Sequence, residues 1–85
     1  MAHSSTTELQ IAGRKYRLYR SSDNERDGMA LELMDETTSS HALVMEVFYS
    51  DVDGAFSFSS FRNEVPLELV ELLISNARVS LPPSV

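Results

Sequence analysis

Between residues 8 and 60 the chain alternates apolar and polar side chains in short runs, which is the pattern of β-strands with one buried face. In segment 8–20 (ELQIAGRKYRLYR), Leu9 and Ile11 alternate with polar residues. An Ala-Gly pair follows, and Tyr16 and Leu18 then resume the alternation. This arrangement predicts a β-hairpin whose turn lies at the Ala-Gly pair.

Two more apolar runs follow, and each comes after a polar loop. Segment 29–35 (MALELMD) follows the turn-forming residues SSDNERDG, and segment 42–50 (ALVMEVFYS) follows DETTSSH. Both runs have the length and alternation of strands. The second run is expected to direct Leu43, Met45, Val47 and Tyr49 to one face of the sheet.

The stretch YSDVDGAFSF places two aspartates and a glycine between aromatic residues, and it could be a metal loop or a turn. A four-residue loop from Asp51 to Gly54 would set Tyr49 opposite Phe56 and Val47 opposite Phe58. A three-residue loop would put both phenylalanines on the wrong face. A calcium site needs six to eight oxygen ligands, and no further aspartate or distant glutamate completes the known loop motif. The pattern therefore predicts a hairpin turn.

Segment 66–78 (PLELVELLISNAR) is the one clear helix, because its apolar residues recur every three to four positions. Pro66 suits the first helical position, Glu68 the positive N-terminal end and Arg78 the negative C-terminal end. The apolar stripe consists of Leu69, Val70, Leu73, Ile74 and Ala77.

These elements predict an α+β fold, a five-stranded antiparallel meander sheet followed by one C-terminal helix packed on one face. We expect a single domain over residues 8–81, with a disordered N-terminal tail at 1–7 and a short C-terminal tail at 82–85. A helix of about four turns is about 20 Å long and covers only two or three strands. Part of the inner face is therefore expected to remain for a second subunit or another protein. The predicted inner face comprises Leu9, Ile11, Tyr16, Leu18, Leu31, Leu33, Leu43, Met45, Val47, Tyr49, Phe56 and Phe58.

Composition and charge narrow the classes of function. The chain has 85 residues, a net charge of −6 and no cysteine, which excludes disulfides and thiol chemistry. The polar N-terminus has no signal-peptide pattern, and no apolar run is long enough to span a bilayer, so a soluble, cytoplasmic protein is expected. An acidic surface repels nucleic-acid phosphates and attracts a basic protein.

The outer sheet face is the predicted interface with a protein partner. Strand alternation directs several large apolar groups and two glutamates away from the helix, and monomers rarely expose so many. We expect this face to bind another protein or a second copy in a homodimer. The predicted interface residues are Tyr19, Glu32, Met34, Val44, Glu46 and Phe48.

A basic segment offers an alternative, binding of single-stranded nucleic acid. RKYRLYR interleaves cations with aromatic residues, which can bind phosphates and stack on bases. The competing interpretation is a cross-strand ladder in which Lys15, Arg17 and Tyr19 face Glu32 and Glu46. The nucleic-acid alternative would use Arg14, Lys15, Arg17, Tyr19 and Arg20.

No catalytic motif accompanies these features. Asp35, Glu36 and His41 could together ligate a metal, but no second histidine lies nearby, so a solvated loop is expected. The serines of FSFSSF lack a nucleophile-elbow motif, and no glycine-rich phosphate loop is present. The sequence therefore predicts a non-catalytic protein-interaction module without cofactor or metal, such as an adaptor, an inhibitor or an immunity-type protein.

Overall fold

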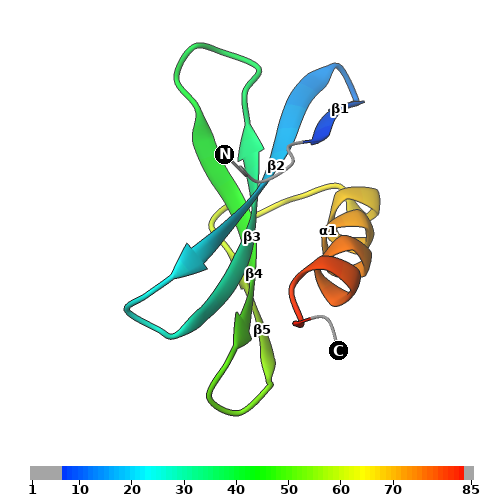
Figure 1. Ribbon diagram of the computed structural model, residues 1–85. Helices are drawn as coiled ribbons and strands as arrows, with labels where there is room; N and C mark the ends of the chain where they lie inside the picture. Colours follow the sequence, from blue (N-terminus) through cyan, green and yellow to red (C-terminus); the bar gives the residue numbers. More distant parts are fainter. Residues whose placement is uncertain (1–6, 84–85) are drawn as a thin grey trace.

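The computed structural model describes residues 7–83, which form five strands and one helix (Figure 1). The predicted tails at 1–6 and 84–85 lie outside the described residues, and Thr7, placed in the N-terminal tail by the sequence pattern, belongs to the first strand. The elements are β1 (Thr7–Ile11), β2 (Arg14–Asp23), β3 (Gly28–Asp35), β4 (Ala42–Ser50), β5 (Phe56–Ser60) and α1 (Leu67–Ser80).

The strands form one antiparallel sheet in the order β1-β2-β3-β4-β5, and α1 packs on one side of it (Figure 1). The predicted five-stranded meander with a C-terminal helix is thus confirmed. α1 contacts β3 and β4, in the middle of the sheet. No helix in residues 7–83 has the length and apolar character needed to cross a membrane.

The β4–β5 hairpin has the predicted register. Tyr49 pairs with Phe56 and Val47 with Phe58, and the Ser50 N–H donates to the Ala55 carbonyl at 3.0 Å to close the loop. Within the loop, the Asp53 carboxylate accepts a hydrogen bond from the Ala55 N–H at 3.0 Å. Gly54 has a φ of 73°, a left-handed conformation that glycine adopts without steric cost. The aspartates and the glycine of this stretch therefore form a turn.

α1 begins one residue later than predicted and extends two residues further. Pro66 is the N-cap, and its carbonyl accepts hydrogen bonds from the N–H groups of Leu69 and Val70. Leu69, Leu73 and Ala77 are fully buried against the sheet, and α1 ends at Ser80, before the prolines at 82 and 83. The Arg20 Nε donates to the Ser80 carbonyl at 2.9 Å, which fixes the C-terminal end of α1 to β2.

The predicted core is wrong at one point, where β4 contains a β-bulge. Leu33 pairs with Met45, but the next residue, Met34, pairs with Leu43, so Val44 is the extra residue of β4. Val44 is fully buried and belongs to the core cluster, whereas Leu43 is half-buried and lies outside it. The predictions that Leu43 faces the helix and that Val44 faces away were therefore wrong, because strict alternation fails at a bulge.

The helix-side core otherwise contains the predicted residues. Tyr16, Leu18, Leu31, Leu33, Met45 and Val47 are buried in it, and Leu9, Ile11, Tyr49 and Phe56 pack against its margin. Phe58 is 46% exposed, because α1 covers the middle of the sheet and not β5.

Candidate functional site

The outer sheet face, opposite α1, has a row of three polar side chains at its centre. Tyr19 of β2 pairs with Glu32 of β3, and Glu32 in turn pairs with Glu46 of β4. Two carboxylates thus lie directly opposite each other on neighbouring strands, an arrangement that destabilises a sheet through like-charge repulsion. Met34, two residues along β3 from Glu32, is half-buried on the same face.

A guanidinium neutralises one of the two carboxylates. Arg26, from the β2–β3 loop, donates to both oxygens of Glu46, at 2.9 Å and 3.3 Å, and it also binds Asp23. Within residues 7–83 Glu32 has no ion-pair partner. Burial and the charge of Glu46 raise the pKa of Glu32 above its usual range. Glu32 is therefore a half-buried carboxylate that a cation from outside the chain would stabilise.

Phe48 lies on this outer face as predicted, but it is not exposed. Its side chain is only 7% exposed, and the Arg26 guanidinium lies 4.1 Å from the ring centroid. The ring also packs against the backbone at Gly28, where a Cβ atom would lie 2.6 Å from its Cζ. With Val44 in the core, the outer face presents Tyr19, Glu32 and Met34, together with a nearly buried Glu46.

Glu36, for which the sequence pattern predicts a solvated loop, is the centre of a polar network. Its carboxylate accepts hydrogen bonds from the Tyr19 hydroxyl and, at 3.0 Å, from the Arg17 Nε. His41 Nδ1 lies 3.6 Å from the same carboxylate. The Tyr19 and Arg17 hydrogen bonds lower the pKa of Glu36, and the same carboxylate raises the pKa of the Tyr19 hydroxyl. This network fixes the Tyr19 side chain.

The basic segment does not form a continuous basic surface. Arg14 pairs with Asp35 at 2.9 Å, Arg17 pairs with Glu8 and Glu36, and Arg20 binds the end of α1. Strand alternation places Arg14 and Arg20 on the helix side and Lys15, Arg17 and Tyr19 on the outer side. The charge pairing differs from the predicted ladder, since Tyr19 lies opposite Glu32 but Arg17 binds Glu8 and Glu36, and Glu46 binds Arg26. This geometry does not favour the nucleic-acid alternative, which needs cations on one face.

Asp35 and Glu36 belong to separate networks. Asp35 is 3% exposed on the helix side and binds Arg14, Arg62 and Thr37. Burial raises the pKa of Asp35, but these hydrogen bonds outweigh it and hold the pKa well below its usual range. Glu36 lies beside His41 on the outer side, whereas Asp35 faces the helix side, so the three side chains do not converge, and the described part of the chain contains no cluster of three metal-ligating side chains.

The acidic loops lie together at one end of the sheet. The Asp51 N–H, in the β4–β5 loop, donates to the carbonyl of Asp27, in the β2–β3 loop, at 2.9 Å. The carboxylates of Glu25, Asp27, Asp51 and Asp53 are on exposed residues of these two loops. This end of the molecule therefore has a concentrated negative charge.

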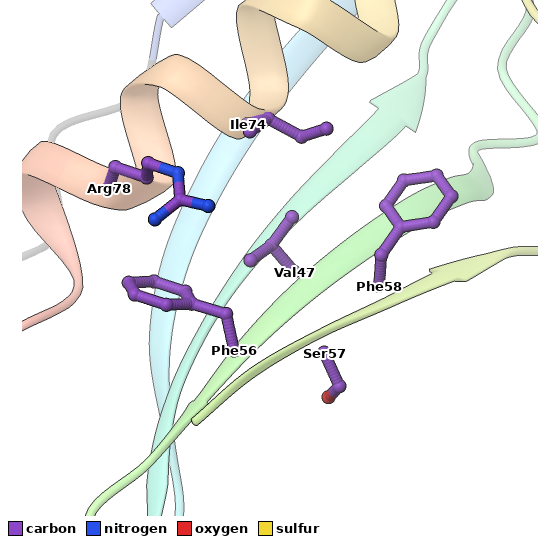
Figure 2. Close-up of a pocket in the computed structure, with 6 residues that line it drawn as sticks. All are labelled: Val47, Phe56, Ser57, Phe58, Ile74 and Arg78. Atoms are coloured by element: carbon purple, nitrogen blue, oxygen red, sulfur yellow. The ribbon is translucent and has the colours of Figure 1, made fainter. Parts of the chain in front are cut away.

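A groove between α1 and β5 is a second candidate site, which the sequence pattern did not identify. Its volume is about 140 Å³, and Figure 2 shows Val47, Phe56 and Phe58 pointing from the sheet toward Ile74 and Arg78 of α1. Ser57 points to the other side of β5 in the same view. The expectation that one helix would leave part of the inner face open is confirmed at this margin, although Ile74 and Arg78 had been assigned only to the core stripe and the helix end.

Comparisons with known protein families, with curated proteins and with solved structures found no match to this chain.

Proposed function

We propose that this protein is a non-catalytic protein-interaction module that binds a basic protein partner through the outer face of its sheet. The observation that carries the proposal is Glu32, a half-buried carboxylate that faces another carboxylate and has no ion pair within residues 7–83. Tyr19 and Met34 flank it with partly exposed aromatic and apolar surface. A lysine or arginine of a partner would offset the repulsion between Glu32 and Glu46.

Long-range charge supports the same kind of partner. The chain has a net charge of −6, and the acidic loops add a concentrated negative potential at one end of the sheet. Such a field accelerates association with a basic surface. An adaptor, an inhibitor and an immunity-type antagonist of a basic enzyme would each act in this way, without chemistry of their own.

A pair of charge-reversal variants tests the proposal. The tagged full-length protein is incubated at low salt with lysate of the source organism, nuclease-treated and untreated, and bound proteins are identified by mass spectrometry. Glu32→Lys places a cation on the outer face, whereas Glu68→Lys makes the same charge change at an exposed position of α1. We expect a stoichiometric partner that wild type and Glu68→Lys retain and Glu32→Lys loses. Equal retention by both variants would contradict the proposed face, and capture that disappears with nuclease would favour nucleic-acid binding.

A further inference from the structure

The free edge of β5 differs from an ordinary edge strand. Edge strands are usually protected from pairing with other chains by charged residues, proline or bulges. β5 has the sequence FSFSS, with no charge and no proline, and it pairs with β4 alone among residues 7–83. Residues 57–60 are all exposed. The opposite edge strand, β1, has the charged residue Glu8, which is ion-paired with Arg17.

The hydrogen-bond pattern shows which backbone groups are available on this edge. The Ser50 N–H bonds to the Ala55 carbonyl, and the Phe61 N–H bonds to the Val44 carbonyl. In an antiparallel ladder the backbone groups of successive residues alternate between the two edges of a strand. Ser57 and Ser59 therefore direct their backbone groups toward β4, and Phe56, Phe58 and Ser60 direct theirs toward the open edge.

The same residues provide side-chain recognition. Phe56 and Phe58 point to the helix side, into the groove that Val47, Ile74 and Arg78 complete (Figure 2). An added strand would lie about 5 Å from β5, and its residues opposite Phe56 and Phe58 would point to this same side. Its backbone would bond to β5 while its alternate side chains entered the groove.

The charge of Arg78 indicates which kind of side chain would enter one end of the groove. The Arg78 guanidinium lies 5.3 Å from the centroid of the Phe56 ring, at the margin of an otherwise apolar groove. Within the described residues Arg78 forms no ion pair. A carboxylate opposite Phe56 would be close enough to bind this guanidinium, and an apolar side chain opposite Phe58 would contact Ile74.

We propose that β5 binds an extended segment of a partner protein by antiparallel strand addition, with an apolar residue opposite Phe58 and, two residues later, an aspartate or glutamate opposite Phe56. Such strand addition is a recurrent mode of peptide recognition, in which the backbone gives affinity and alternate side chains give specificity. The proposal rests on the proposed function as an interaction module, but it uses a different surface from the outer face. A second copy of this chain is the less suitable occupant, because both copies have a net charge of −6.

A peptide selection tests the proposal directly. A phage-displayed library of random octapeptides is selected on the full-length protein, and the strongest binder is synthesised and titrated into the ¹⁵N-labelled protein. We expect the selected sequences to share the order apolar-any-acidic. The amide shifts should change mainly at residues 56–60 and 74–78, and hydrogen exchange at the Phe58 N–H should slow at least about tenfold, since strand pairing protects that group.

Variants identify the two side-chain contacts. Arg78→Gln should weaken peptide binding about fivefold. Replacing the peptide's acidic residue by its amide should weaken binding to the wild-type protein by the same factor, and should not weaken binding to Arg78→Gln any further. Lys15→Gln, which removes a cation from the outer side of β2, should leave the affinity unchanged. N-methylation of the peptide residue opposite Phe58 should abolish binding, because it removes a backbone donor.

Besides a peptide that binds elsewhere, three results would overturn the proposal. One is a library without enrichment, and another is a consensus without the acidic position. The third is a concentration-dependent dimer in light scattering that Phe58→Ser abolishes, which would mean that a second copy occupies the edge. A selected peptide that binds the outer face, and is lost with Glu32→Lys but not with Arg78→Gln, would contradict strand addition while leaving the proposed function supported.

Discussion

Glu32 and Glu46 lie directly opposite each other on β3 and β4, and Arg26 binds Glu46 but forms no ion pair with Glu32. The Glu46 carboxylate is thus neutralised by Arg26, whereas the negative charge of Glu32 is unfavourable in the folded state. Residues that weaken the folded state in this way are often retained at sites of binding. The proposed function and the first prediction both follow from this pair.

Glu32→Gln should stabilise the isolated protein at pH 7 by about 0.2–1 kcal/mol, the cost of like charges directly opposite in a sheet. Because the pKa of Glu32 is raised on folding, the wild-type protein loses stability as the pH rises through the window above the ordinary value of 4.5. The stability difference between variant and wild type should therefore disappear below that pH. Urea unfolding of both proteins from pH 4 to pH 8 measures this stability difference. A variant less stable than wild type at pH 7 would contradict the prediction.

Asp35 should show the opposite pH dependence. It is buried between Arg14, Arg62 and Thr37, so Asp35→Asn should cost about 1–3 kcal/mol at pH 7. Its folded pKa is depressed, and its contribution is therefore present above the ordinary value of 3.8 and is lost as the pH falls toward the folded pKa. Chemical denaturation at pH 7 and pH 3 should show the difference narrowing at the lower pH. Asp51→Asn, in an exposed loop, is the matched control and should change little at either pH.

The bulge in β4 predicts unequal effects of two neighbouring substitutions. Val44→Ala removes buried core surface and should lower the free energy of unfolding by about 1–3 kcal/mol, whereas Leu43→Ala, at a half-buried position outside the core cluster, should cost less than about 1 kcal/mol. Denaturant midpoints of the two variants are the measurement. A larger loss for Leu43→Ala would mean that β4 follows strict alternation and contains no bulge.

The β4–β5 register could be predicted from the sequence because it depends on local information. The loop from Asp51 to Gly54 connects adjacent strands, and only an even loop length pairs Tyr49 with Phe56. The β4 bulge could not be predicted from the sequence, because Leu43 and Val44 are both apolar and either residue satisfies the pattern of a buried position. A bulge changes the parity of a strand without leaving a signal in hydrophobicity alone.

The candidate sites were harder to predict because their contacts are non-local. Glu36 lies in a polar run typical of a loop, and its burial results from Arg17 and Tyr19 on another strand. Arg26 similarly reads as a loop cation, although it covers Phe48 and binds Glu46. The α1–β5 groove depends on where the helix lies across the sheet, which the helical periodicity of residues 66–78 does not specify.

The packing of Gly28 against β4 gives a last prediction. A Cβ atom at this position would lie 2.1 Å from the Tyr49 carbonyl oxygen and 2.6 Å from the Phe48 Cζ. Neither neighbour can move easily, because Tyr49 is in the ladder and Phe48 lies between this backbone and Arg26. Gly28→Ala should therefore destabilise the fold by at least about 2 kcal/mol, as overpacking of a core does.

Gly13→Ala is the control, because its φ is 75° but no atom lies within 4 Å of the added Cβ. The backbone strain alone should cost about 1 kcal/mol, less than the close contact at Gly28. Thermal unfolding of Gly28→Ala in the wild-type and in the Phe48→Ala background separates the contact with the ring from the contact with the Tyr49 carbonyl. Removing the ring should reduce the cost of Gly28→Ala but not abolish it, since the Tyr49 carbonyl remains. Equal costs at Gly13 and Gly28 would show that β3 and β4 do not approach as closely as this structure requires.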